Sequence, residues 1–528
     1  MNRREWHWAM LVTLALVVAS SLPYLIAWAV RPEGAHFTGL LVNPLDGHSY
    51  IAKMRQGLDG SWRFRLAFTP ERQTGAYLFL LHIALGHVAR WTGLPLIGVY
   101  HGARALAGIA ASLVAYRFIT RLGGEPGQRR VAFLLLMFSS GLGWLAAASG
   151  YLPADLWVPE AFFFYSILAT PHFPLAIALM LVILMALAQP GREPGWREAM
   201  IAAGASIGLS IVQPFGVIPV YATLAVWLAL RWLRDRRLAW RTVGWTAAAG
   251  LVALIYPLYG LLAIRADPVL AGWNVQNQTP SPPAWDWLLS FGLVAALAVP
   301  GVVAALRQRS DGSLLMVAWV IAAGVGMYAP LTLQRRLALG LQVPLALLAA
   351  AGWCQAIWPR LRARLRRPAT VALVGFSALT NLFLVAMLGL AAVSGEPRFY
   401  LSDGEWQALA WLRENADHDQ VVLCAPQTGM FVPAWAGQKV VYGHPFETVD
   451  AERRQAQVEA YWAGEMDSAE QESFLRENRV GYVLVGPREL EIGDLRSEIR
   501  DWRLEIGEIE GELVFEAEDV RLYEVHER

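Results

Sequence analysis

The sequence predicts a polytopic α-helical membrane protein of about 11 spans with a C-terminal extracytoplasmic α/β domain. Of its 528 residues, 56% are hydrophobic, whereas soluble domains contain roughly 45–50%. The charges are uneven: residues 1–395 carry 31 Lys and Arg against 14 Asp and Glu, and residues 396–528 carry 13 against 29. Because anionic lipid phosphates attract Arg while a solvated domain needs only a polar surface, this asymmetry indicates two environments. We therefore expect a transmembrane domain over residues 1–395, which includes a first outer loop at 31–95, and a soluble domain over 396–528.

Eleven apolar segments are candidate spans. The first exceeds the roughly 7 to 15 residue apolar core of a signal peptide, so we interpret it as a retained span. Arg-rich segments between spans mark the cytoplasmic face, because cytoplasmic loops accumulate Lys and Arg, and they place the C-terminal domain outside the plasma membrane. The expected spans cover residues 9–30, 95–118, 131–149, 175–189, 199–212, 216–230, 242–264, 288–306, 314–328, 337–358 and 370–393.

The most polar stretch of the first half, Asn43 to Gly75, falls in the first outer loop. Two short segments, 48–58 and 76–91, are amphipathic and too short for a comfortable crossing, so we expect them to lie in the membrane interface. This stretch and the adjacent pair Arg335 and Arg336 place positive charge on the outer face, where the charge rule disfavours it. An anionic ligand on that face would explain both exceptions.

The C-terminal segment alternates short helix and strand patterns. It contains no glycine-rich phosphate loop, CxxC pair or GxSxG turn, so we assign it no independent chemistry. In its GHPFET loop, His444 and Glu447 are either membrane-facing groups or ordinary loop residues, and we favour the second interpretation. The arginines of the first half lie in short loops between spans, so we expect no nucleic-acid partner.

Asp46 is the foremost candidate for a catalytic residue. An ionisable group beside a bilayer is energetically costly, so it usually forms an ion pair or takes part in the function of the protein. The alternative is that its carboxylate caps the amphipathic helix that follows it. Lys53 and Arg55 lie on the same short helix, which favours a functional role. Glu71, just before the second amphipathic segment, has the same two interpretations.

Three further residues of the outer face could supply metal ligands. Asp155, Glu160 and His172 could bring oxygen and nitrogen atoms near Asp46, but their spacing is no metal signature. Metal binding therefore stays one of two open alternatives.

The basic residues near the outer ends of spans also have two interpretations. Arg335 and Arg336 either reach lipid headgroups or form a phosphate site. Arg104 and His101, early in the second span, are more often packing or headgroup contacts.

These features together resemble the GT-C superfamily of polyprenyl-phosphate-sugar-dependent glycosyltransferases, which includes protein O-mannosyltransferases and lipid A aminoarabinose transferases. The resemblance covers the first four spans and, more loosely, the C-terminal domain. In such enzymes the Asp is often followed by Glu, whereas Gly47 follows Asp46 here, so any role of that second group would fall to Glu71, Glu160 or His48. The matching residues are Asp46, Tyr50 and Gly57 in the spacing D-x3-Y-x6-G, Glu71 in a TPE triplet, and Arg104 at the head of the next span.

The resemblance implies transfer of a sugar from a polyprenyl-phosphate donor to a hydroxyl of a protein, lipid or glycan acceptor on the outer face, with inversion. The residues permit this chemistry, since Asp46 could act as general base. Fixed cations stabilise a departing phosphate. The candidates for that contact are Lys53, Arg55, Arg335 and Arg336. A divalent metal cofactor stays open, because members of the superfamily differ in metal use.

Two other classes of protein compete with this interpretation. A transporter or lipid flippase would need charged or unwound groups midway through its spans, whereas the charges here concentrate at outer ends and loops. The Gly-rich spans and the Gln213-Pro214 turn keep that class open. A non-catalytic protein that binds envelope polymers through its outer domain is the third alternative.

Overall fold

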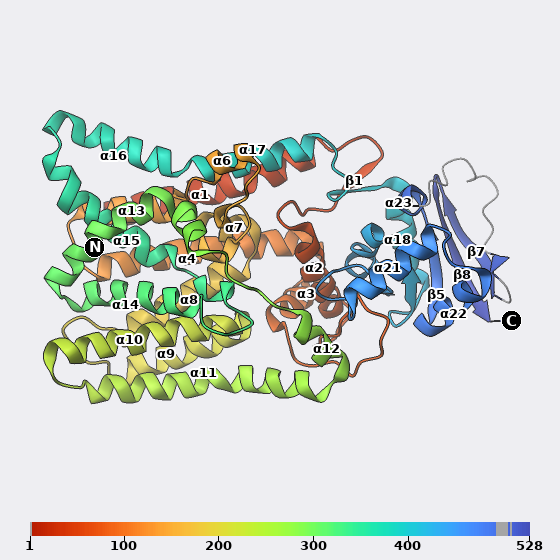
Figure 1. The fold of residues 1–528 in the computed structure, drawn as a ribbon, viewed down its shortest axis with the longest axis horizontal. Helices are drawn as coiled ribbons and strands as arrows, with labels where there is room; N and C mark the ends of the chain where they lie inside the picture. The colour runs from red at the N-terminus through yellow and green to blue at the C-terminus, as the bar shows by residue number, and fades with distance from the viewer. Residues whose placement is uncertain (1–2, 493–504, 507–508, 528) are drawn as a thin grey trace. The chain divides into compact units, whose positions relative to one another are not determined.

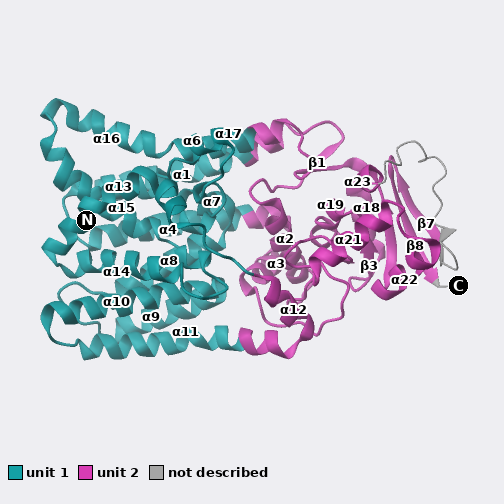
Figure 2. Ribbon diagram, viewed as in Figure 1, with its two compact units in different colours: residues 1–23, 101–259, 278–389 teal, residues 24–100, 260–277, 390–528 magenta. Residues whose placement is uncertain are grey.

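The computed structural model describes residues 3–492, 505–506 and 509–527. Its contacts divide the chain into two compact units, coloured separately in Figure 2. Unit 1 comprises residues 1–23, 101–259 and 278–389, and unit 2 comprises residues 24–100, 260–277 and 390–528. The first outer loop, which we expected within the transmembrane domain, therefore shares a unit with the C-terminal segment.

Unit 1 is built from helices, which Figure 1 labels along the chain. The helices with residues in this unit are α1 (Arg3–Ala29), α4 (Leu96–Arg121), α5 (Pro126–Phe138), α6 (Gly143–Ala146), α7 (Phe163–Ala169), α8 (His172–Leu187), α9 (Trp196–Val212), α10 (Val217–Asp235), α11 (Trp240–Ala266), α13 (Ala284–Gln308), α14 (Asp311–Gly326), α15 (Gln342–Gly352), α16 (Ala363–Ser377) and α17 (Leu379–Val393). Short turns of 3-10 or π helix join several of them.

Long apolar helices make this a multi-pass membrane protein. Within the described residues, six helices are long and apolar enough to cross a bilayer, or seven if α16 and α17, bent by 42° at their junction, form one span. Two apolar helices, α8 and α14, are shorter, with 16 residues each. The count of about 11 spans stays a prediction.

The segment expected as one span at 131–149 is interrupted, because α5 ends at Phe138 and α6 begins only at Gly143. Backbone groups freed by this break need partners, since an unpaired N–H or C=O in an apolar interior is costly. Ser140 N–H donates to the carbonyl of Ser377 at 2.7 Å, where α16 ends, and Leu142 N–H donates to Leu289 at 3.1 Å. The break is therefore closed by neighbouring helices of the same unit.

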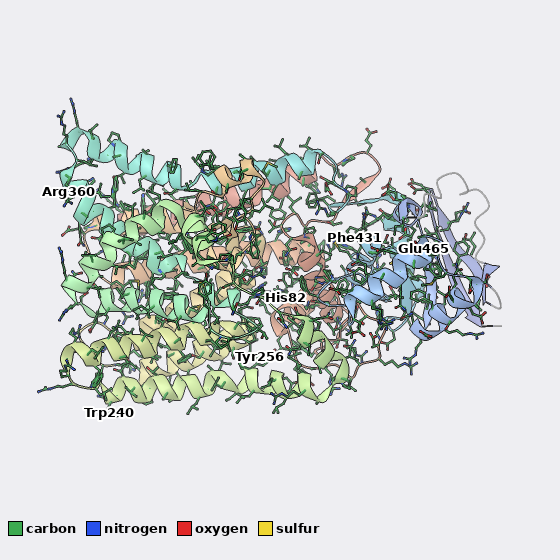
Figure 3. All side chains as sticks on the ribbon, viewed as in Figure 1. His82, Trp240, Tyr256, Arg360, Phe431 and Glu465 are labelled. Atoms are coloured by element: carbon green, nitrogen blue, oxygen red, sulfur yellow. The ribbon has the colours of Figure 1, made fainter. Side chains whose placement is uncertain are left out.

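Basic loops gather at one end of unit 1. Arg234 contacts Asp311 at 2.8 Å and donates to the carbonyl of Arg309 at 2.6 Å, which ties the last turn of α10 to the start of α14. Figure 3 shows Trp240, the first residue of α11, and Arg360, the last residue of a short 3-10 turn, at the same end of this unit in that view. This grouping is typical of a cytoplasmic face.

Unit 2 combines a mixed sheet with short helices. Its main sheet has six strands in the order β4-β3-β5-β8-β7-β6, in which β4, β3 and β5 are parallel and the others pair antiparallel. Strands β1 and β2 form a separate antiparallel pair. The elements are β1 (Ala35–Phe37), α2 (Pro44–Leu58), α3 (Leu80–Thr92), α12 (Pro268–Gln276), β2 (Tyr400–Ser402), α18 (Asp403–Asn415), β3 (Val421–Leu423), α19 (Pro426–Gly429), α20 (Val432–Trp435), β4 (Lys439–Val440), α21 (Ala451–Trp462), α22 (Ser468–Asn478), β5 (Val480–Val485), α23 (Pro487–Ile492), β6 (Glu505–Ile506), β7 (Ile509–Ala517) and β8 (Val520–Glu527).

Helix α2 is part of the core of this unit. Ile51 and Met54, on the face that we expected to lie in the membrane interface, are fully buried. They belong to one apolar cluster with Leu409 of α18, Phe431 before α20 and Val422 of β3. Protein side chains rather than lipid therefore cover this face of α2.

Helices α2 and α3 cross at two glycines. A Cβ added to Gly57 would lie 2.1 Å from the carbonyl oxygen of Ile83, and one added to Gly86 would lie 1.9 Å from that of Met54. Real Cβ atoms do not approach backbone oxygens this closely, so the crossing requires glycine on both helices. It holds α2 rigidly at the place where the candidate site residues lie.

Candidate functional site

Asp46 lies in the first turn of α2. The helix begins because Asn43 adopts a left-handed conformation (φ 43°) and Pro44, with its fixed φ, occupies the first helical position. Asn43, not Asp46, is the N-cap residue, so the capping role considered from the sequence is wrong. The Asn43 amide donates a hydrogen bond to the carboxylate of Asp46. The Asp46 side chain remains 40% exposed, which leaves its carboxylate accessible.

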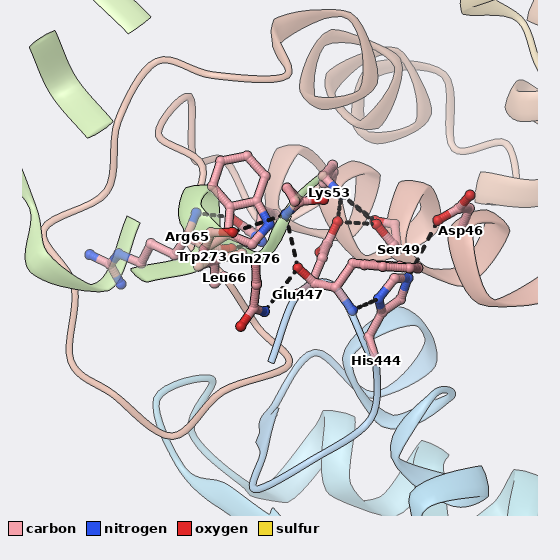
Figure 4. A network of polar contacts seen from close by, with 12 residues as sticks. Asp46, Ser49, Lys53, Arg65, Leu66, Trp273, Gln276, His444 and Glu447 are labelled. Atoms are coloured by element: carbon pink, nitrogen blue, oxygen red, sulfur yellow. Dashed lines mark hydrogen bonds and ion pairs between the residues drawn. The ribbon is translucent and has the colours of Figure 1, made fainter. Parts of the chain in front are cut away.

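His444 follows the carboxyl end of β4 and faces Asp46. Its backbone N–H donates to the Thr448 hydroxyl at 3.3 Å, and that hydroxyl donates to the carbonyl of Phe68 at 2.7 Å, which fixes the turn. The ring Nδ1 accepts from the Phe446 N–H at 3.1 Å, so this ring carries its proton on Nε2. Nε2 lies 3.5 Å from the Asp46 carboxylate in a side chain only 2% exposed. Figure 4 shows the His444 ring and the Asp46 carboxylate facing each other.

A buried ion pair lies about two turns further along α2. Lys53 Nζ is 2.6 Å from Glu447 Oε1, and the hydroxyl of Ser49 donates to the same oxygen at 2.6 Å (Figure 4). Lys53 is only 1% exposed, and its ammonium lies 4.5 Å from the centre of the Phe79 ring. A buried charge of this kind persists only where it is paired and hydrogen-bonded. Lys53 therefore anchors the 444–447 turn to α2.

The pKa values of two neighbouring groups follow from this burial. Burial acts to raise the pKa of Glu447, but the positive charge of Lys53 and the hydrogen bonds from Lys53 and Ser49 act against it, and the net shift is downward. Burial also lowers the pKa of His48 to about 4, against the weaker opposing effect of its hydrogen bond to the Pro44 carbonyl. His48 is therefore neutral at pH 7, and Phe431 packs against its ring with 4.8 Å between the centres.

The other candidates of the first outer loop contact the C-terminal segment of the same unit. Glu71 pairs with Arg454 of α21 at 2.8 Å and accepts from the Thr69 hydroxyl; it caps no helix among the described residues. Arg55, 8% exposed, donates to the carbonyl of Trp435 at 3.2 Å, at the end of α20. Both side chains hold the loop and the C-terminal segment together.

Unit 1 contains a second charged cluster. The Glu160 carboxylate, 2% exposed, lies 3.5 Å from Arg335 Nε and 3.6 Å from Arg336 Nη1. Arg335 also lies over the Trp157 ring, 5.0 Å from its centre. Two guanidinium groups thus face one buried carboxylate. Partly buried guanidinium groups of this kind are suited to bind phosphate.

The remaining candidates of unit 1 have structural partners. Arg104, 2% exposed, donates to the carbonyls of Ile167 at 2.8 Å and Ser20 at 3.3 Å, which joins three helices. His172 is 4% exposed, with its ring 4.2 Å from that of Phe173. Neither side chain is open to a ligand.

The three residues considered as metal ligands do not form a divalent-ion site. Asp155 accepts the backbone N–H groups of Gly141 and Gly143 at 3.0 and 3.1 Å. Glu160 faces the two arginines, whose charges oppose a cation. No group of three or more His, Cys, Asp or Glu in the described part of the chain has the geometry of a metal site. The donor set therefore does not fit a metal ion here.

His444 and Glu447 are the site residues to which sequence reasoning gave too little weight. Their position offered a signal, because ligand sites of parallel sheets lie beyond the carboxyl ends of the strands, and both residues follow the strand β4. Gly443, directly before His444, is a second feature of this turn. The fold requires glycine there, because a Cβ would lie 2.3 Å from the carbonyl oxygen of Gly429. Their partners on α2 are hundreds of residues away, so the pairing itself was not visible.

No family model matches the chain, and no curated protein matches it. Solved structures do match. ArnT from Cupriavidus metallidurans, bound to undecaprenyl phosphate, is 12% identical over 99% of this chain and 98% of its own, with a TM-score of 0.58.

Two further structures share the architecture. The apo oligosaccharyltransferase of Archaeoglobus fulgidus is 15% identical over 92% of this chain and 70% of its own, with a TM-score of 0.55. The arabinofuranosyltransferase AftD from Mycobacteria is 17% identical over 99% of this chain but only 42% of its own, with a TM-score of 0.56. The resemblance that the sequence predicted is thus confirmed at the level of fold: the chain has the fold of the GT-C glycosyltransferases.

Proposed function

We propose that the protein is a membrane glycosyltransferase that moves a sugar from a polyprenyl-phosphate donor to a hydroxyl acceptor on the extracytoplasmic side, with inversion. The GT-C fold supports the general class, and one of the similar structures, ArnT, holds undecaprenyl phosphate. The observation that carries the proposal is the Asp46 carboxylate, accessible in the first turn of α2 and faced by the buried His444 ring.

Asp46 is suited to act as the general base. Its carboxylate can take the proton of an incoming hydroxyl, and placed bases of this kind contribute about 10² to 10⁴ in rate. The hydroxyl oxygen then bonds to the anomeric carbon as the bond from that carbon to the phosphate oxygen breaks. The polyprenyl phosphate leaves with the bonding electrons, and the proton stays on Asp46.

His444 is suited to position Asp46 rather than to take the proton itself. With Nδ1 occupied by the Phe446 N–H, its only ring proton is on Nε2, the nitrogen that faces the carboxylate. A donor at this place, together with the Asn43 amide, orients the carboxylate. The Lys53 and Glu447 pair supports His444 by fixing the turn that carries it.

The cluster of Arg335, Arg336 and Glu160 is our candidate for contact with the donor phosphate. Its two guanidinium groups would stabilise the negative charge that develops on the departing phosphate. Lys53 and Arg55, which the sequence also offered, are not used, because both are buried and already paired with protein groups.

A transporter is the second candidate, since the break between α5 and α6 is the kind of unwound segment that transporters use. Its backbone groups bond to neighbouring helices and to Asp155, which favours a structural role. Movement of a polyprenyl-phosphate sugar across sealed vesicles without cleavage of the glycosidic bond would support the transporter instead.

The test of the proposal compares Asp46→Asn with Asp59→Asn, a carboxylate at the other end of the same helix. Full-length variants in nanodiscs are given a panel of polyprenyl-phosphate sugars and hydroxyl acceptors, and transfer and undecaprenyl phosphate binding are measured. We expect Asp46→Asn to bind normally but to lose about 10² or more in transfer rate, while Asp59→Asn retains it. Unchanged transfer by Asp46→Asn would remove the base assignment.

A second comparison isolates the role of His444. His444→Gln keeps an N–H donor near the carboxylate, whereas His444→Ala does not. Positioning predicts a lower kcat for His444→Ala and recovery in His444→Gln with little change in KM. Equal loss in both variants would assign the ring a different role.

A further inference from the structure

A polar cavity lies in unit 2, at the amino ends of the parallel strands. Its volume is about 370 Å³, within the range of roughly 300 to 1,000 Å³ typical of ligand sites. Lys439 begins β4, and Arg479 directly precedes β5. Arg65 and Arg72, from the first outer loop, complete a set of four cations in its lining.

The cavity carries an excess of positive charge. Asp417 and Asp419 are the two carboxylates in its lining. Asp419 serves two cations at once, with Lys439 at 3.2 Å and Arg65 at 3.6 Å. Arg72 also acts on Asp419 electrostatically, but neither Arg72 nor Arg479 forms a direct ion pair with a residue that the structure describes. Two guanidinium groups are thus available to an anionic ligand, and planar Arg groups bind carboxylate or phosphate in pairs of hydrogen bonds.

This cavity is separate from the site around Asp46. The cavity lies at the amino end of β4, whereas His444 follows its carboxyl end, five positions after Lys439. Because an extended chain rises about 3.3 Å per residue, the chain between them spans at most roughly 16 Å. A ligand group bound at the cavity would be remote from the reacting atoms. Enzymes use such remote contacts to hold the acceptor while chemistry proceeds elsewhere.

We propose that the cavity binds an acidic oligosaccharide, as the acceptor of the transfer reaction; this rests on the proposed function. Arg72 and Arg479 would bind its acidic group, and the Asp417 carboxylate would accept hydrogen bonds from its hydroxyls. Both signs of charge in one cavity suit a ligand that carries acidic groups and hydroxyls together. A lipid headgroup fits less well, because Pro70 and Val421 are the only apolar residues in the described lining and leave no place for acyl chains.

The test uses the full chain in nanodiscs of phosphatidylcholine, with trigalacturonate as the probe and its neutral methyl ester as the matched control. We expect trigalacturonate to bind and the ester to bind at least about tenfold more weakly, because hydrogen bonds to a charged group are the stronger ones. Binding should also weaken as salt is raised. Equal affinity for the ester would overturn the proposal, and so would inorganic phosphate competing as well as the sugar.

Variants of the cavity lining should change the affinity for trigalacturonate in opposite directions. Arg72→Gln with Arg479→Gln should weaken trigalacturonate binding about tenfold or more, whereas Arg453→Gln, an exposed arginine of α21 outside the lining, should not. Asp419→Asn should tighten binding by about threefold, since Lys439 and Arg65 then lose their competing carboxylate. Misfolding cannot produce tighter binding. Unchanged affinity in all variants would overturn the proposal.

Two outcomes separate this proposal from the proposed function. If Asp46→Asn abolishes transfer but trigalacturonate does not bind, the cavity proposal fails alone. If trigalacturonate binds through Arg72 and Arg479 while Asp46→Asn transfers normally, the base assignment fails alone. Replacing part of the phosphatidylcholine by phosphatidylglycerol completes the test, because displacement of the probe by acidic lipid would identify a headgroup site and overturn the oligosaccharide.

Discussion

The ion pair between Lys53 and Glu447 permits a quantitative test of how the site is held. At the 2.6 Å separation of its charged atoms, the attraction is about 6 kcal/mol for an effective dielectric constant of about 20. Desolvation offsets much of this gain, so the pair contributes little net stability. Removing one partner, however, leaves the other charge buried and unpaired. We expect Lys53→Met or Glu447→Gln alone to lower the free energy of unfolding by about 3 to 5 kcal/mol.

The double variant should recover most of that loss. In Lys53→Met with Glu447→Gln no charge remains buried, and Ser49 still has an amide oxygen to which it can donate. Denaturant titration of the detergent-solubilised full chain measures the free energy of unfolding of each variant. The double-mutant cycle then gives the coupling energy between Lys53 and Glu447. The exposed pair Arg453 and Asp450 is the matched control, and its removal should cost less than about 1 kcal/mol. Single variants that cost no more than this control, or a double variant that costs the sum of the two, would refute the structural role and return Lys53 to the candidates for phosphate contact.

Three further predictions concern other features. Burial lowers the pKa of His48 from 6.5 to about 4, so the unfolded chain takes up a proton at this residue before the folded protein does. We therefore expect the free energy of unfolding to fall by about 3 kcal/mol as pH falls from 6.5 to 4. His48→Gln should remove this pH dependence of the free energy of unfolding, and an unchanged dependence would contradict the prediction. Gly86→Ala should cost about 1 to 3 kcal/mol or more, since its Cβ would lie 1.9 Å from a backbone oxygen, whereas Gly98→Ala, whose Cβ meets nothing nearer than 4.0 Å, should be neutral or stabilising in the same assay. Arg335→Gln should weaken undecaprenyl phosphate binding about tenfold, and an equal effect of Arg307→Gln, outside that cluster, would show that only general charge matters.

Periodicity predicted much of the secondary structure, because it depends on local pattern. The apolar segment expected at 242–264 corresponds to α11, and the amphipathic segment expected at 48–58 is the greater part of α2. The interruption between α5 and α6 was not predicted, since an apolar run shows no sign of a break that distant helices stabilise. Hydropathy measures whether a segment can lie in an apolar environment. The break depends instead on hydrogen-bond partners from distant helices, such as the carbonyl of Ser377.

The candidate site was predicted in part. The polar content of the first outer loop indicated Asp46, and the structure keeps it accessible. The amphipathic face of α2 was correctly recognised, but its partner was not: a single sequence shows which residues avoid water without showing whether lipid or protein covers them. For the same reason Lys53 was interpreted as a ligand contact, while its partner Glu447 was interpreted as ordinary loop.

The packing of α2 into the core of unit 2 has a consequence for biosynthesis. Ser49 and Glu447, which share a hydrogen bond, are separated by 398 positions. At about 5 to 20 residues per second a ribosome needs roughly 20 to 80 s to cover that distance. During this interval Ile51 and Met54 lack the apolar side chains of the C-terminal segment that bury them in the folded protein. We therefore expect chaperones or the membrane surface to bind the nascent loop until the C-terminal segment is made. A chain that stops before the sheet is made would leave Asp46 on a helix without its support.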